Sequence, residues 1–83
     1  MRVIAELPHP VCKITIFSMN QKFIIKLEKG VYEQSYKVAE IDMTDGVDGV
    51  FKILDDGFMK TVDERFKQMR ADFSAAFNRY EAL

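Results

Sequence analysis

Two residues that could carry out chemistry lie close together near the start of the chain. His9 and Cys12 are three residues apart in the segment Pro8-His9-Pro10-Val11-Cys12-Lys13. An imidazole or ammonium group near a thiol can lower its pKa and make it a nucleophile, so this pair could belong to a cysteine-dependent enzyme. The strand pattern described below turns Cys12 toward an apolar face, where burial raises a thiol pKa. We therefore favour a structural cysteine and a turn histidine, and assign no catalytic residue.

An acidic segment could supply oxygen ligands to a cation. Residues 42–49 read Asp-Met-Thr-Asp-Gly-Val-Asp-Gly, and hard cations prefer several oxygen ligands close together. Aligning Asp48 and Gly49 with the fifth and sixth positions of a calcium loop puts Gly46 at the third position and Asp55, rather than a glutamate, at the twelfth. His9 and Cys12 are too few for a structural zinc site. We expect no metal and no cofactor, and interpret the aspartates as caps and solvated turn residues.

Length and composition exclude several classes of protein. The chain has 83 residues, of which 48% are hydrophobic, and 12 Lys and Arg stand against 13 Asp and Glu for a net charge of -1. Such a chain is globular and too short for more than one domain, so residues 1–83 form a single predicted domain. No apolar run approaches the ~20 residues needed to cross a bilayer. We expect no membrane association and a cytoplasmic location.

The hydrophobic pattern predicts an α+β fold. The first forty residues alternate with period two, and short turn-like segments divide them into four predicted strands, over 2–7, 12–19, 22–28 and 31–41. Connections this short join antiparallel neighbours, so residues 1–41 should form a β-meander. An acidic connection over 42–57 contains a short predicted helix, started by Thr44 or Asp45. A long helix over 58–82, capped by Asp55 or Asp56, should pack on one face of the sheet.

Three hairpins define one apolar face of the predicted sheet. A turn at Asn20-Gln21 sets Ile25 opposite Ile16. Centring the outer turns on Lys29-Gly30 and on residues 8–11 sets Tyr32 opposite Leu27 and Val3 opposite Ile16, on that same face. The reverse face then carries charged side chains. Gln34, which falls on the apolar face, is expected to satisfy a backbone group.

The long helix carries an apolar stripe that is too long for the sheet. Its members recur at spacings of three and four residues, as in a heptad repeat: Met59, Val62, Phe66, Met69, Phe73, Ala76, Tyr80 and Leu83. A helix of ~25 residues is ~38 Å long, whereas a seven-residue strand extends only ~23 Å. We therefore expect Phe73, Phe77 and Tyr80 to form the interface of a homodimer, either by helix packing against helix or by exchange of helices between the two sheets. In the alternative, Gly57 lies outside the helix, the helix bends or frays after Ala75, and the short helix covers these rings within one chain.

The reverse face of the sheet offers a second candidate surface, for single-stranded nucleic acid. An aromatic side chain flanked by cations can stack on bases and contact phosphates. The candidate residues are Arg2, Lys13, Phe17, Lys22 and Lys26. Sites of this kind usually carry several stacking aromatic residues, and this face has one. We therefore favour a solvated sheet face and keep nucleic-acid binding as the alternative.

The order of four strands and one long helix resembles the β4α unit of the Whirly and PUR-type single-strand-binding families. This resemblance covers the topology from Arg2 to Ala82 without a shared motif, so it assigns no site residue. The opening MRVIAELPHP, followed by CKITIF, resembles short bacterial proteins of the Bacteroidetes type, which implies a bacterial cytoplasmic source and nothing about mechanism. The sequence thus favours a small non-enzymatic interaction module that associates with itself through the long helix. The same module could also bind another protein. Single-stranded nucleic-acid binding is the alternative, and a Cys/His-dependent enzyme comes third.

Overall fold

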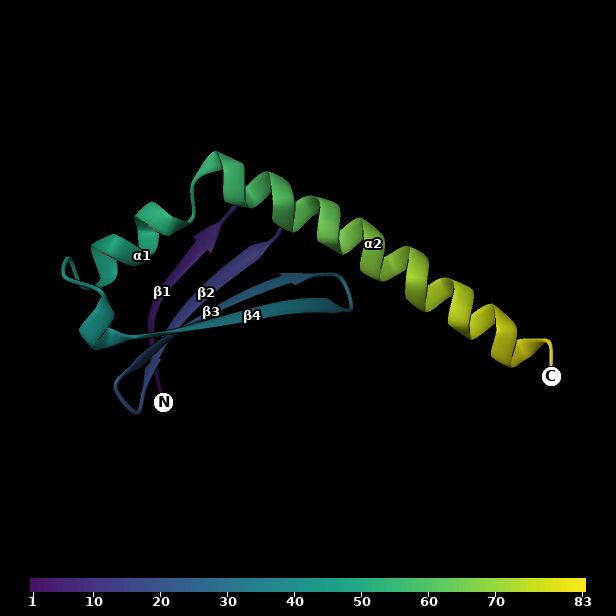
Figure 1. Ribbon diagram of the computed structural model, residues 1–83, viewed down its shortest axis with the longest axis horizontal. Helices are drawn as coiled ribbons and strands as arrows, with labels where there is room; N and C mark the ends of the chain where they lie inside the picture. Colours follow the sequence, from purple (N-terminus) through teal and green to yellow (C-terminus); the bar gives the residue numbers. More distant parts are fainter.

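Four antiparallel strands form one sheet, and two helices cover one of its faces (Figure 1). The computed structural model describes all 83 residues. In chain order the elements are β1 (Arg2–Pro8), β2 (Lys13–Met19), β3 (Lys22–Lys29), β4 (Tyr32–Ala39), the 3-10 turn η1 (Glu40–Asp42), α1 (Val47–Ile53) and α2 (Asp56–Glu81). The strands are adjacent in sequence order, which confirms the predicted meander and the α+β class.

The central hairpin has the predicted register. Ile16 lies opposite Ile25, and the two residues of the connecting turn, Asn20 and Gln21, have φ angles of 52° and 63°. Positive φ at both central residues is the signature of a type I′ turn, whose twist matches that of the strands. Turn chemistry and the apolar pattern therefore agree here.

The β3–β4 hairpin is paired two residues away from the prediction. Leu27 lies opposite Gln34 rather than Tyr32, and the two-residue loop is Gly30-Val31. Gly30 has a φ of 61°, and glycine at the first loop position is typical of a type II′ turn. A shift of two residues leaves every side chain on its predicted face, so the hydrophobic pattern could not distinguish the two registers.

Strand β1 departs further from its predicted pairing with β2, because it contains a β-bulge. Leu7 lies opposite Ile14 instead of Cys12, and the register shifts between Val3 and Ala5. Beyond that bulge Val3 lies opposite Phe17 on the reverse face, and Arg2 lies opposite Ser18 on the helix-covered face. The predicted faces of Val3 and Arg2 were therefore wrong, since a one-residue bulge inverts the alternation that follows it.

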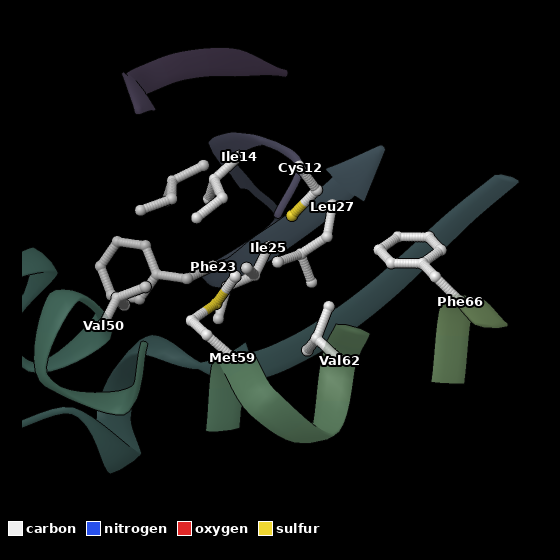
Figure 2. Packing of buried hydrophobic residues seen from close by; sticks show 10 residues of the cluster. Cys12, Ile14, Phe23, Ile25, Leu27, Val50, Met59, Val62 and Phe66 are labelled. Carbon is white, nitrogen blue, oxygen red and sulfur yellow. The ribbon is translucent and has the colours of Figure 1, made fainter. Parts of the chain in front are cut away.

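The core lies between the covered face of the sheet and the two helices. Figure 2 shows side chains of the sheet facing Met59 and Val62 of α2, with Val50 of α1 at one end. Gln34 is buried there: its Nε2 donates to the carbonyl oxygen of Val62 (3.0 Å), and its Oε1 accepts from the Tyr36 hydroxyl (2.6 Å). The expectation that Gln34 satisfies a backbone group is confirmed.

The two helices begin differently. The Asp55 carboxylate accepts a hydrogen bond from the Phe58 N–H at 2.8 Å, which caps α2 as predicted. Helix α1 begins after Gly46 without any side-chain cap. Asp45, which was expected to start α1, instead contacts Lys52 at 2.9 Å. The predicted cap of α1 was therefore wrong.

Helix α2 makes the molecule elongated. The dimensions are 51 × 27 × 20 Å and the radius of gyration is 15.2 Å, against about 12 Å for a compact domain of this length. In Figure 1 α2 crosses the sheet, passes the turn between β3 and β4 and continues as a free rod to the C-terminus. We call residues 70–81 the overhang, since every one of them is exposed.

Candidate functional site

The apolar stripe of α2 is divided into a buried half and an exposed half. Met59, Val62 and Phe66 are at most 3% exposed, whereas Phe73, Phe77 and Tyr80 are 62%, 49% and 68% exposed. Met69, between the two groups, is half-buried against the core. The same face of one helix therefore packs on the sheet at its beginning and meets solvent at its end.

A cluster of ion pairs marks the point where α2 leaves the sheet. The Asp63 carboxylate lies 3.2 Å from Lys29 Nζ, at the end of β3, and 3.4 Å from Lys67 Nζ, one turn further along α2. The hydrogen bond from Lys29, helped by the charge of Lys67, holds the pKa of Asp63 below its usual value. These contacts join the β3–β4 hairpin to the helix immediately before the overhang.

Nothing within the chain covers the overhang. Helix α2 runs without interruption from Asp56 to Glu81, and Gly57 lies inside it. Helix α1, with its buried Val50, packs at the opposite end of the sheet (Figure 1). The alternative of a bent or frayed helix covered by the short helix is therefore not what the chain adopts.

The surface of the overhang is aromatic, with charged residues along its borders. The rings of Phe77 and Tyr80 lie 5.9 Å apart and are inclined by 43°. Asp72 accepts a hydrogen bond from Gln68 (2.9 Å), and Arg79 is exposed one heptad further along. An exposed aromatic surface of this kind is suited to burial against another apolar surface.

A depression of 300 Å³ adjoins the start of the overhang. Val31, Tyr32 and Phe66 form its apolar lining, and Lys29, Lys67 and Arg70 surround it. Val31 is 92% exposed at the tip of the β3–β4 hairpin. The sequence did not predict this depression because Val31 was placed inside a strand. The glycine before it, which favours a type II′ loop at Gly30-Val31, was the available signal.

The candidate catalytic pair, His9 and Cys12, lines one shallow depression at the β1–β2 connection. Cys12 is 7% exposed, and burial raises the pKa of its thiol. His9 is occupied by its own loop, because its Nδ1 accepts a hydrogen bond from the Val11 N–H at 3.1 Å. A neutral, covered thiol is a poor nucleophile. The geometry agrees with a structural cysteine and a turn histidine.

The reverse face of the sheet brings together only part of the candidate nucleic-acid surface. Lys13, Phe17, Lys22 and Lys26 share this face, but Arg2 lies on the other one. Lys26 contacts Glu28 at 3.6 Å and Glu33 at 3.5 Å. Carboxylates thus compensate the charge of the central lysine.

Metal ligands do not gather in the structure: no group of three or more His, Cys, Asp or Glu side chains is placed to hold an ion. Neither helix has a stretch long and apolar enough to span a membrane.

Comparisons with protein-family models, curated proteins and solved structures found no match. The overhang is therefore the feature of the molecule that bears most directly on function.

Proposed function

We propose that this protein is a small interaction module, without enzymatic activity of its own, that forms a homodimer through the overhang of α2. The supporting observation is the change in exposure along one stripe, from 3% at Phe66 to 62% at Phe73. Full burial of an aromatic side chain contributes about 1.5–3 kcal/mol. Three such rings per subunit are a large contribution relative to the ~5–15 kcal/mol net stability of a small domain.

A second copy is the favoured partner because it carries a matching stripe. Most soluble oligomers are homo-oligomers with twofold symmetry, and two identical amphipathic helices can bury the same rings against each other. The helix is already held by the sheet, so association does not have to nucleate it. A further protein that presents an apolar helix would compete for the same surface. The resemblance of the opening MRVIAELPHP and of CKITIF to bacterial proteins supports a bacterial cytoplasmic setting for this association.

Sedimentation of the wild type and of Phe77→Asp tests the dimer. The substitution lies on the overhang, away from the core, so we expect it to leave the fold intact and to abolish association by placing a carboxylate in the apolar interface. Lys60→Asp, on another side of the helix, is the control and should associate like the wild type. A wild type that stays monomeric as its concentration rises would contradict the proposal.

Single-stranded nucleic acid is the weaker candidate ligand. It would use Phe17 with Lys13 and Lys22 on the open sheet face, but Lys26 is already paired with two glutamates. Titration with fluorescent single-stranded oligonucleotides at low and moderate salt separates the two functions, because phosphate-driven binding weakens steeply as salt rises. We expect no binding at low salt.

A further inference from the structure

The charges along the overhang specify how two copies would meet. In heptad terms Phe66, Phe73 and Tyr80 occupy position a of the stripe, and Met69, Ala76 and Leu83 occupy position d. The neighbouring g positions hold Arg65, Asp72 and Arg79, and the e positions hold Arg70 and Phe77. These bordering residues lie beside the partner helix in any coiled-coil pairing, so their charges favour some arrangements over others.

We infer that the two overhangs pair antiparallel, with Phe73 of one copy packed on Ala76 of the other and Met69 packed on Tyr80. This inference rests on the proposed dimer and adds its orientation and register. Large residues then meet small or flexible ones, and the methionine sulfur lies against an aromatic ring, which is a favourable contact. The twofold axis repeats each of these layers.

The bordering charges are self-complementary in this register. Asp72 of each copy faces Arg79 of the other, so the dimer contains two opposite-charge pairs. Arg70 of each copy faces Phe77 of the other, where a guanidinium can lie over the aromatic ring. Within one chain Asp72 and Arg79 are seven residues apart, about 10.5 Å along the axis, so they are not partners of each other.

Other arrangements place like charges together. Sliding the antiparallel pair by one heptad brings Asp72 against its own copy, or Arg79 against its own copy. A parallel pair brings Arg65 against Arg70 of the partner, twice. Like-charge contacts of this kind are a common means of excluding wrong pairings.

The depression beside Phe66 continues the proposed interface. In the antiparallel register the partner's Leu83 reaches the level of Phe66, where Val31 and Tyr32 line the depression of 300 Å³. Leu83 is fully exposed in the single chain, and Val31 is 92% exposed. The stripe of the second copy would therefore replace the sheet at the point where the sheet ends.

Charge reversal tests the register. Asp72→Arg places two arginines together at each pair, and Arg79→Asp places two aspartates together, so each variant should raise the dimer dissociation constant about tenfold at low salt, since two attractive pairs become repulsive. The double variant Asp72→Arg/Arg79→Asp re-forms both pairs and should return to within about threefold of the wild type. Glu81→Arg changes the net charge as Asp72→Arg does, but at an outward position, and should leave the constant unchanged.

Sedimentation equilibrium distinguishes the possible failures. Rescue in the double variant supports the register. A wild type that dimerises and is disrupted by Phe77→Asp, but whose double reversal shows no rescue, overturns the register and leaves the proposed dimer standing. Tighter association of Asp72→Arg alone would also overturn the register. A monomeric wild type overturns both.

Discussion

Phe66 and Phe73 are two turns apart on the same face of α2, yet Phe66 is 3% exposed and Phe73 is 62% exposed. The sheet ends between them, because strands of seven or eight residues are shorter than a 26-residue helix. The apolar stripe of α2 is therefore buried by the sheet around Phe66 and exposed to solvent around Phe73, where no other part of the chain covers it.

This contrast predicts unequal effects of the same substitution. Phe66→Ala removes a ring from the core and should lower the free energy of unfolding by about 3–5 kcal/mol. Phe73→Ala, at an exposed position, should change it by less than about 0.5 kcal/mol when the protein is dilute enough to be monomeric. Urea unfolding monitored by circular dichroism measures both. Equal losses at the two positions would mean that the overhang is packed in the single chain.

The ion pairs of Asp63 predict a pH dependence of stability. Its pKa is lowered in the folded protein, chiefly by the hydrogen bond from Lys29, so the ionised carboxylate stabilises the fold above the unfolded pKa. This contribution is lost as the pH falls through the depressed, folded-state pKa. Asp63→Asn should therefore be less stable than the wild type at pH 7, and the difference should shrink in acid. Urea unfolding of both proteins between neutral and acidic pH measures it, and a difference independent of pH would contradict this account.

The burial of Cys12 predicts an unreactive thiol. Burial raises its pKa, and only 7% of the residue is exposed, so a thiol reagent at neutral pH should react much more slowly with the folded protein than with the urea-unfolded chain. His9→Ala should leave the native rate low, because His9 Nδ1 serves the Val11 N–H rather than the sulfur. A folded-state rate close to that of the unfolded chain would restore the enzymatic hypothesis.

The sequence predicted the elements and the central hairpin because two independent signals agreed there. Ile16 and Ile25 belong to the apolar pattern, and the two-residue connection Asn20-Gln21 is short enough only for a hairpin; the structure shows that tight turn, with positive φ at both residues. In the outer hairpins the period-two pattern is unchanged by a shift of two residues, so only the turn could fix the register. Residues 3–5 are all apolar, so the alternation could not specify which of them faces the core, and the bulge there moved Arg2 away from the candidate nucleic-acid face.

Part of the candidate site could also be predicted from the sequence. Heptad spacing places Phe73, Phe77 and Tyr80 on the stripe, and helix geometry shows that the stripe is longer than the sheet. The residue that determines where the sheet stops, Val31 at the tip of the hairpin, depends on the turn register and was misplaced. A partner for these rings would lie outside the chain, so the sequence bears on it only through the charges that border the stripe.

Hydrogen exchange of α2 at increasing protein concentration tests the central claim most directly. Backbone amides of residues 70–81 exchange quickly when an isolated helical segment frays, and more slowly when a partner stabilises it. We predict that protection of these amides rises with concentration in the wild type and not in Phe77→Asp, while protection of β2 and β3 changes little at concentrations where the fold is stable. Protection of the overhang that is independent of concentration would contradict the account.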